Sequence, residues 1–271
     1  MESGRIEIET GGGIAHVELA REARLNAMDG EMFEAIGDAF RRLGRDGAVR
    51  AILISGRGRH FTAGLDLHYA GTQFAPGDDA GRAAEARLRH VEHLQAAFTA
   101  VEEVRVPVIA AIHGGCIGAG VDLAAACDLR VASADAFFQV AEVDIAITAD
   151  LGTLQRLGYL IPQGVLRELA YTGRRLEADE AARLGLVNRV ADSREAAIDA
   201  GLELARAIAA KSPLAVAGAK ASLNYSRGRP VEEGLRQVAL WNASGLATGD
   251  IAEAIRARRE KREPRFGDLS S

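Results

Sequence analysis

The sequence has few of the residues that build disulfide-linked, metal-binding or nucleic-acid-binding proteins. Only two cysteines, Cys116 and Cys127, occur in 271 residues, which is too few for a disulfide framework and lacks the paired spacing of a zinc site. Aromatic residues make up 5% of the chain and its formal net charge is −5, so aromatic platforms and a basic surface are both missing. We therefore expect two reduced, buried cysteines, no metal and no nucleic-acid partner.

Long apolar runs are missing as well. No stretch approaches the length of about 20 residues that a membrane-spanning helix needs. Residues 1–5 lack the charged and then apolar pattern of a signal peptide, and residues 268–271 do not form a peroxisomal Ser-Lys-Leu ending. These absences predict a cytoplasmic protein with no membrane partner.

What remains is the composition of a globular protein, 48% hydrophobic and 26% charged. Strand and helix patterns alternate over residues 1–194, whereas residues 195–271 show helix patterns alone. We predict an α/β core over 1–194 and a helical region over 195–271. The expected strands are 6–8, 14–19, 49–54 and 108–112, and the expected helices are 28–43, 88–104, 195–210, 214–225, 231–246 and 251–261. Residues 71–87, rich in glycine and aspartate, are expected to form a mobile loop.

Three acidic residues, Asp122, Glu142 and Asp150, lie among apolar and small residues. An ionised carboxylate is costly in such surroundings, and burial or a like-charged neighbour moves its pKa toward neutral pH. The three acids are therefore candidates for proton transfer. Each also has a structural alternative. Asp122 and Asp150 can cap helices, and Glu142 can pair with Arg130 or Arg156.

Two glycine-containing turns follow predicted strands, one at residues 61–67 and one at 118–120. Small residues let a ligand approach backbone N–H groups closely, and two such donors on one carbonyl oxygen form an oxyanion hole. Each donor stabilises an enolate by about 3 kcal/mol. The alternative is that the glycines serve only tight turns. Residues 118–120 lack the third glycine and the ribose-binding acid of a dinucleotide site.

Several short motifs occur in a fixed order along almost the whole chain. They are Asn26-Ala27-Met28, Phe61-Thr62-Ala63-Gly64-Leu65-Asp66-Leu67, Ala111 to Asp128, Tyr171-Thr172-Gly173-Arg174, Ala178-Asp179-Glu180-Ala181 and Gly185-Leu186-Val187. In these motifs the chain resembles the crotonase (enoyl-CoA hydratase/isomerase) superfamily. The resemblance implies an α/β spiral of ββα turns, a helical C-terminal trimerisation region and acyl-CoA thioester substrates.

Position by position, the resemblance also implies which backbone groups meet the thioester. The N–H groups of Ala63 and Ala119 match the two oxyanion-hole donors. Further contacts with the substrate or its CoA are implied for Arg24, Ala27, Gly64, Leu65, Asp66, Leu67 and Gly118. CoA would be part of the substrate, so no separate cofactor is implied. A homo-oligomer, either a trimer or a dimer of trimers, is expected.

The number of acids distinguishes the reactions within this superfamily. The segments around Asp122, Glu142 and Asp150, together with Tyr225 to Asp250, resemble Δ3,5-Δ2,4-dienoyl-CoA isomerase. That resemblance implies that Glu142 removes a proton at C2 of the substrate and Asp150 adds one at C6, with Asp122 supporting them. Asp144, close by in sequence, is expected to be exposed or structural. Two alternatives are an enoyl-CoA hydratase, in which Asp122 and Glu142 hold water, and a non-catalytic acyl-CoA-binding protein.

Overall fold

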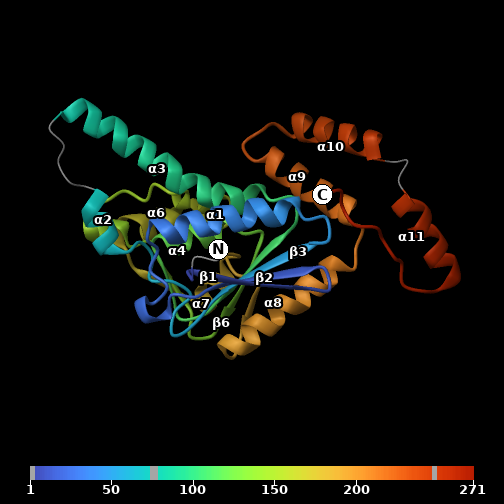
Figure 1. Cartoon of the computed structure of the whole chain (residues 1–271), viewed down its shortest axis with the longest axis horizontal. Coiled ribbons are helices and arrows are strands. Elements are labelled where there is room, and N and C mark those ends of the chain that lie inside the picture. Colours follow the sequence, from blue (N-terminus) through green and yellow to red (C-terminus); the bar gives the residue numbers. More distant parts are fainter. Residues whose placement is uncertain (1–3, 74–78, 246–248) are drawn as a thin grey trace.

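A computed structural model describes residues 4–73, 79–245 and 249–271 of the chain (Figure 1). Its main sheet has six strands in the order β1-β2-β3-β4-β6-β9, of which β1 pairs antiparallel with β2 and the others run parallel. The strands are β1 (Ile6–Gly11), β2 (Ile14–Leu19), β3 (Ala51–Gly56), β4 (Val108–Ile112), β6 (Leu129–Ser133) and β9 (Arg189–Ala191). The predicted strands are confirmed within one or two residues at most ends.

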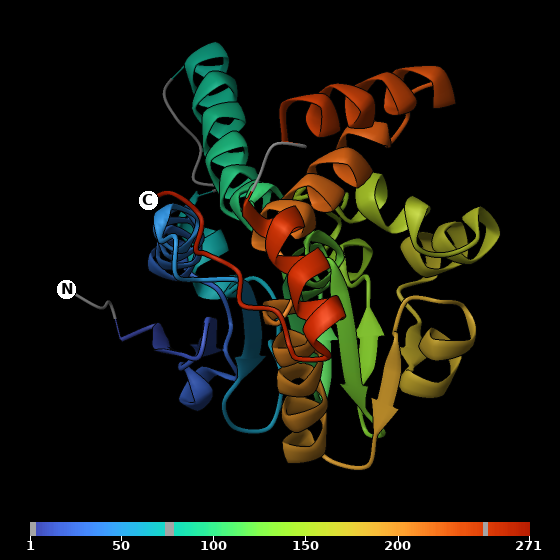
Figure 2. The same ribbon diagram turned by 90° about the vertical axis from the view of Figure 1, so that its right-hand side faces the viewer.

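Apolar residues on successive positions of β3 explain why both faces of this sheet are covered. Ile52 and Ile54 belong to the larger buried cluster with α1 (Gly30–Arg45) and α3 (Ala80–Glu103), whereas Leu53 belongs to a second cluster with α8 (Arg194–Ala209). A strand buried on both faces reads as a continuous apolar run, as residues 51–54 do. The sheet therefore lies between helices on both sides (Figure 2).

A second, three-stranded sheet lies at the carboxyl end of β4 and carries the segment with the acids. Its order is β5 (Gly115–Ile117), β7 (Phe137–Gln139) and β8 (Arg175–Glu177). Strand β4 passes into β5 through Gly114, whose positive φ of 53° suits glycine. Around it lie the short helices α2 (Leu67–Gln73), α4 (Ala119–Ala126), α5 (Thr153–Arg156), α6 (Gln163–Thr172) and α7 (Ala178–Arg183).

The helices after β9 divide into two groups by their packing. Helix α8 packs on the main sheet and so belongs to the core, although it lies beyond the predicted boundary at residue 194. Helices α9 (Pro213–Ser226), α10 (Val231–Gly245) and α11 (Gly249–Glu260) extend away from the core in Figure 1. The tail then returns. Leu269 is buried in the main cluster and its N–H donates to Gly47 O at 3.1 Å.

The prediction of a mobile loop over residues 71–87 is wrong at both ends of that range, where the chain is helical. Helix α2 continues to Gln73, and α3 begins at Ala80, where Asp79 caps it by accepting a hydrogen bond from Arg82 N at 2.8 Å. The N-cap aspartate and the alanine, arginine and glutamate that follow it favour a helix over the loop that the glycines suggested. Residues 74–78 of the expected loop lie outside the described residues. In the part of the chain that the structure covers, no helix is long and apolar enough to cross a membrane.

Candidate active site

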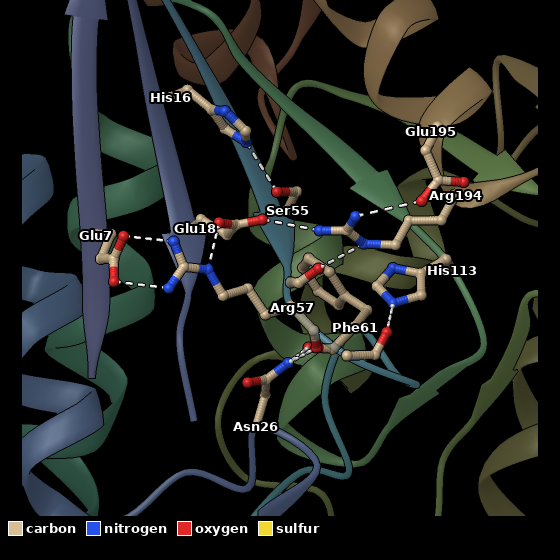
Figure 3. Close-up of polar contacts among 12 residues, drawn as sticks. Glu7, His16, Glu18, Asn26, Ser55, Arg57, Phe61, His113, Arg194 and Glu195 are labelled. Carbon is tan, nitrogen blue, oxygen red and sulfur yellow. Dashed lines mark hydrogen bonds and ion pairs between the residues drawn. The ribbon is translucent and has the colours of Figure 1, made fainter. Parts of the chain in front are cut away.

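Asn26 fixes the first glycine turn in place. Its side chain is fully buried, and its Nδ2 donates to three carbonyl oxygens of the turn, those of Arg57, His60 and Phe61, at 2.8–3.1 Å (Figure 3). His113 Nε2 lies 2.9 Å from Gly58 O, so it supports the same turn. A side chain that satisfies several buried carbonyls orders the loop that carries them. Residues 61–67 therefore present their backbone in a defined conformation.

An ion-pair network holds the start of this loop against the main sheet (Figure 3). Arg57 pairs with Glu7 of β1 and with Glu18 of β2, the latter at 2.7 Å. Arg194, at the start of α8, pairs with the other oxygen of Glu18 at 2.8 Å and donates to Gly56 O. The network joins β1, β2, β3 and α8 at the carboxyl edge of the sheet, directly below the glycine turn.

The backbone donors of the first turn differ from the expected ones. Ala63 N–H, predicted as an oxyanion donor, already donates to Leu25 O at 2.9 Å and is not available to a ligand. Leu65 N–H, two residues on, has no acceptor among the described residues. Its neighbour Gly64 has a φ of +85° and lies against the second turn, because a Cβ on it would come within 2.4 Å of Ile117 O. The assignment of Ala63 was therefore wrong, and Leu65 is the free donor.

The second predicted donor is the backbone N–H group of Ala119. Ala119 is the first residue of α4, so its N–H has no intrahelical partner, and no acceptor for it is found in the described residues. A Cβ on Gly64 would lie 3.4 Å from Ala119 N. The free N–H of Ala119 therefore lies next to the residue that precedes Leu65. Two unsatisfied backbone donors on adjacent turns are candidates for an oxyanion hole.

Asp122 is the most buried of the three acids, with 1% of its surface exposed. Its Oδ1 accepts a hydrogen bond from Thr153 N at 2.5 Å, and its Oδ2 is buried without a partner. Burial, with a further contribution from the charge of Glu142, raises the pKa of Asp122 to about 7. Asp122 does not cap its own helix. It reaches across to the first residue of α5 instead.

Glu142 lies beside the second turn. Its Oε1 is 3.3 Å from the position that a Cβ on Gly118 would take, so glycine at 118 leaves room for the carboxylate next to the free N–H of Ala119. Its Oε2 is buried without a partner. Burial, and then the charge of Asp150, raises the pKa of Glu142 above the ordinary glutamate value. An unpaired, partly buried carboxylate with a raised pKa can act as a general base.

Asp150 lies in a more open place than the sequence suggested. The residue is exposed rather than enclosed by apolar side chains, although partial burial of its carboxyl group still raises its pKa. Gln95 of α3 donates to its backbone oxygen at 2.6 Å. Asp150 also lines a cavity of about 390 Å³, together with Gln95, Thr99, Leu151, Gly152, Tyr159 and other residues. Asp150 is thus the most exposed of the three acids.

The structural alternatives for the acids are not realised. Arg130 donates to the carbonyl oxygens of Leu186, Ala124 and Cys127, and Arg156 pairs with Glu102 at 2.9 Å, so neither arginine neutralises Glu142. Helix α5 begins after Gly152 without a side-chain cap from Asp150. Asp144 is exposed, as expected, and accepts from Gln139 at 3.4 Å. Among the described residues, no arginine or lysine side chain pairs with Asp122, Glu142 or Asp150.

The residues implied as CoA contacts differ in their availability. Arg24 is exposed, and Leu67 has 62% of its surface exposed. Asp66 is already engaged, because its carboxylate accepts from Arg21 at 2.7 Å and from His68 N at 2.9 Å. The guanidinium of Arg21 holds the pKa of Asp66 below its usual value. Asp66 therefore orders the start of α2 rather than offering a free carboxylate.

Metal binding and thiol chemistry find no support in the same region. Over the residues that the structure describes, no group of three histidine, cysteine, aspartate or glutamate side chains could hold a metal ion. Cys116 and Cys127 are both free and buried, as predicted. Burial raises the pKa of the Cys127 thiol to about 12, so it is not a nucleophile at neutral pH.

Comparison with known proteins agrees with this geometry. The family model "Enoyl-CoA hydratase/isomerase" matches residues 9–269. The chain belongs to the enoyl-CoA hydratase/isomerase family. It is 45% identical to the peroxisomal Delta(3,5)-Delta(2,4)-dienoyl-CoA isomerase of Arabidopsis thaliana over 97% of this chain and 96% of that protein. It is also 45% identical to the mitochondrial Delta(3,5)-Delta(2,4)-dienoyl-CoA isomerase of Homo sapiens, over 92% of this chain and 77% of that protein.

Solved structures of this family have the same fold. An enoyl-CoA hydratase from Bacillus anthracis superposes with a TM-score of 0.87 at 30% identity, over 97% of this chain and 98% of that one. This confirms the predicted crotonase architecture. The expected cytoplasmic location is contradicted, because the similar isomerases are named as peroxisomal in Arabidopsis thaliana and mitochondrial in Homo sapiens.

Several functional residues of this family member were not found from the sequence. Thr153 supplies the backbone N–H that binds Asp122, and Gln95 holds the backbone of Asp150. His90 lies on the same helix as Gln95, five residues before it. Gln95 and His90 lie more than 50 positions before Asp150, and no local motif marks either of them.

Proposed function

We propose that the protein is a dienoyl-CoA isomerase that converts a 3,5-dienoyl-CoA thioester into its 2,4-dienoyl isomer. One observation carries the proposal. Two acids with raised pKa values occupy different places, Glu142 beside Gly118 of the second turn and Asp150 at an exposed position that lines a cavity. Two separated proton-transfer groups suit a reaction that removes a proton at one carbon and adds a proton four carbons further along. The similarity to named dienoyl-CoA isomerases supports the same reaction.

In the proposed first step the thioester oxygen accepts hydrogen bonds from the N–H groups of Leu65 and Ala119. The carboxylate of Glu142 removes a proton from C2, and the C2–H electron pair moves into the conjugated system. The resulting dienolate carries its negative charge on the thioester oxygen, where the two donors stabilise it by about 3 kcal/mol each. Glu142 suits this step because its Oε2 has no partner and it lies beside Ala119.

In the second step the carboxyl group of Asp150 donates a proton to C6, and the double bonds shift to positions 2 and 4. Asp122 is a positioning residue in this scheme. By accepting from Thr153 N, it fixes the segment that follows Asp150. One proton is removed and one added, so the reaction is redox-neutral. We propose that it requires no metal and no cofactor beyond the CoA of the substrate.

We infer that CoA lies along the first glycine turn, where the backbone of Ala27 and of residues 63–67 borders the thioester site. Arg24 is the basic residue proposed to approach a CoA phosphate, since its side chain is exposed and makes no contact that the structure records in the described residues. Arg21 is unsuitable, because it is engaged with Asp66 and Asp29.

We also propose a homo-oligomer, a trimer or a dimer of trimers, assembled through the C-terminal helices. Apolar side chains on these helices are exposed in the single chain, Leu223 at 71%, Val231 at 78% and Leu235 at 62%. Val231 and Leu235 are four residues apart and so share one face of α10. Such faces are usually covered by a partner. Light scattering should show the oligomer, and Val231→Glu with Leu235→Glu should dissociate it, whereas Leu88→Glu should not.

The direct test is spectroscopic. Purified protein should convert a 3,5-dienoyl-CoA into the more strongly absorbing 2,4-dienoyl-CoA. Rapid hydration of a 2-enoyl-CoA with no such conversion would favour the hydratase alternative. No turnover of either substrate, with acyl-CoA still bound, would favour the non-catalytic binding protein.

A further inference from the structure

The carboxyl group of Asp150 is held in place by its backbone rather than by a side-chain partner. Among the described residues, no hydrogen bond or ion pair joins this carboxyl group to another residue, and the group borders the cavity of about 390 Å³. A proton donor must meet its carbon at a defined distance, and a displacement of about 1 Å can cost about 10² in rate. The groups that hold the backbone of this segment therefore matter for the proposed proton transfer.

Two side chains bind that backbone at successive carbonyl groups. Gln95 of α3 donates to Asp150 O at 2.6 Å. Arg156 of α5 donates from Nη1 to Leu151 O at 3.1 Å. The next residue, Gly152, has a φ of +127°, and a Cβ on it would lie 1.8 Å from Arg156 Nη1. Glycine at position 152 thus lets the guanidinium lie directly against the backbone that follows Asp150.

Glu102, near the end of α3, fixes the guanidinium of Arg156. Its Oε2 accepts a hydrogen bond from Arg156 Nε at 2.9 Å and lies 2.9 Å from Nη2 of the same group. Only 20% of the Glu102 side chain and 13% of the Arg156 side chain are exposed. Because a guanidinium is planar and rigid, binding two of its nitrogens to a carboxylate restricts the direction of the third. That third nitrogen, Nη1, is the one that reaches Leu151 O.

The other oxygen of Glu102 connects this pair to the C-terminal helices. Oε1 pairs with Arg227, the residue that follows α9. Asn224 of α9 donates from Nδ2 to Glu102 O at 3.1 Å. Arg156 and Arg227 both line the cavity that Asp150 borders. A continuous set of contacts therefore runs from α9 through Glu102 and Arg156 to the backbone beside the acid.

We propose that Arg156 is a positioning residue for the proton donor Asp150, and that Glu102, held in turn by Arg227, orients it. By holding the Leu151 carbonyl, Arg156 keeps the carboxyl group of Asp150 at the distance from C6 that proton transfer needs. The inference rests on the proposed isomerase function and deepens it. The step at C2 is independent of this contact, because the other proton-transfer group lies on a different segment.

The test separates the step at C6 from the step at C2 in the full-length protein. Arg156→Gln should lower kcat for the conversion of 3,5- to 2,4-dienoyl-CoA by about 10 to 10², with KM unchanged. Exchange of the C2 hydrogen with deuterated solvent, followed by NMR, should keep its wild-type rate, because Glu142 is untouched. Arg156→Lys should lose less, since it keeps the charge but cannot bind Glu102 and Leu151 O in one plane.

Three further variants test the route and control for a loss of folding. Arg227→Gln, at the more exposed partner of Glu102, should show the same selective loss of conversion, but of only about threefold. Adding Arg156→Gln to Asp150→Asn should cause no further loss, because the acid that Arg156 positions is already disabled. Arg89→Gln removes two ion pairs on the exposed surface of α3, with Glu85 and Glu92, and should behave as wild type.

Three outcomes would overturn the proposal. Unchanged kcat in either Arg156→Gln or Arg227→Gln would show that Asp150 keeps its place without these contacts. Equal losses of conversion and of C2 exchange would show a general structural role. A full additional loss in the double variant would show that Arg156 acts by a route other than Asp150. If the wild-type protein does not isomerise a 3,5-dienoyl-CoA, the proposed function fails instead, which separates the two failures.

Discussion

The carboxylate of Asp122 on α4 accepts a hydrogen bond from the backbone N–H of Thr153 on α5, 2.5 Å away. This contact joins the helix that carries Ala119 to the segment that carries Asp150, because Thr153 lies 31 residues after Asp122 in the chain. The other carboxylate oxygen of Asp122, Oδ2, is buried and has no hydrogen-bond partner among the described residues. An ionised carboxylate buried at this position lowers the stability of the fold. The hydrogen bond that joins α4 to the start of α5 is therefore the structural reason for an aspartate at position 122.

Asp150→Asn should separate the two proton transfers. We expect the conversion of 3,5- to 2,4-dienoyl-CoA to fall by about 10² to 10⁴, because asparagine cannot donate a proton to C6. Exchange of the C2 hydrogen with deuterated solvent, followed by NMR, should continue, because Glu142 is intact. Glu142→Gln should lose both activities, and Asp144→Asn, a matched change at an exposed neighbour, should lose neither. Loss of C2 exchange in Asp150→Asn would contradict the division of roles.

Asp122→Asn should alter the pH dependence of stability. The pKa of Asp122 is raised from 3.8 to about 7, so the folded state binds the extra proton and the free energy of unfolding falls as pH rises between these values. The penalty is at most about 4 kcal/mol above neutral pH. Asparagine keeps an oxygen for Thr153 N and removes this penalty.

We therefore expect Asp122→Asn to be more stable than wild type at about pH 9, with the difference shrinking toward about pH 4. Urea denaturation at several pH values measures it. A constant difference across the pH range would show that Asp122 titrates normally in the folded protein.

Ala119→Pro should test the second backbone donor. Ala119 is the first residue of α4, where proline is tolerated because that N–H makes no helical bond. The change removes the N–H and should lower kcat by about 10² to 10³, the usual cost of one oxyanion donor. The melting temperature, followed by circular dichroism, should change little. Retained activity would place the thioester oxygen elsewhere.

Lys220→Met should destabilise the attachment of α9 without touching the chemistry. Lys220 Nζ lies 2.7 Å from Asp128 Oδ2 and 3.0 Å from Val106 O, and only 6% of the residue is exposed. Removing one partner of a buried pair leaves the other charge uncompensated, so we expect a loss of about 3 kcal/mol in the free energy of unfolding. Lys211→Met, at an exposed lysine, is the control. Equal stability of the two variants would mean that solvent compensates Asp128.

The sequence predicts the elements and acids of this site better than their surroundings. Alternating and helical apolar patterns locate β2, β3, α1 and α8, because a strand or helix with one buried face has apolar residues at regular intervals in its sequence. The acids are recognisable because carboxylates among apolar residues are costly. Asp150 shows the limit of that reasoning, since apolar neighbours in sequence do not enclose it in the fold.

The backbone donors and the α3 side chains could not be predicted in the same way. Ala63 and Leu65 both lie in the glycine turn, and only the three-dimensional path shows that Leu25 O already takes the Ala63 N–H. Gln95 contacts the backbone of Asp150 through the tertiary packing of α3, which no local sequence pattern records.

The C-terminal helices are secured at both of their ends. Helix α8 fixes the chain on the main sheet before α9, and after α11 Leu269 is buried in the core while Arg50 pairs with Asp268 at 2.8 Å. Helices α9 to α11 therefore form a loop closed by two anchors rather than a free appendage. A single proteolytic cut inside that loop would leave both fragments docked, and the nicked protein would migrate as one species until it was denatured.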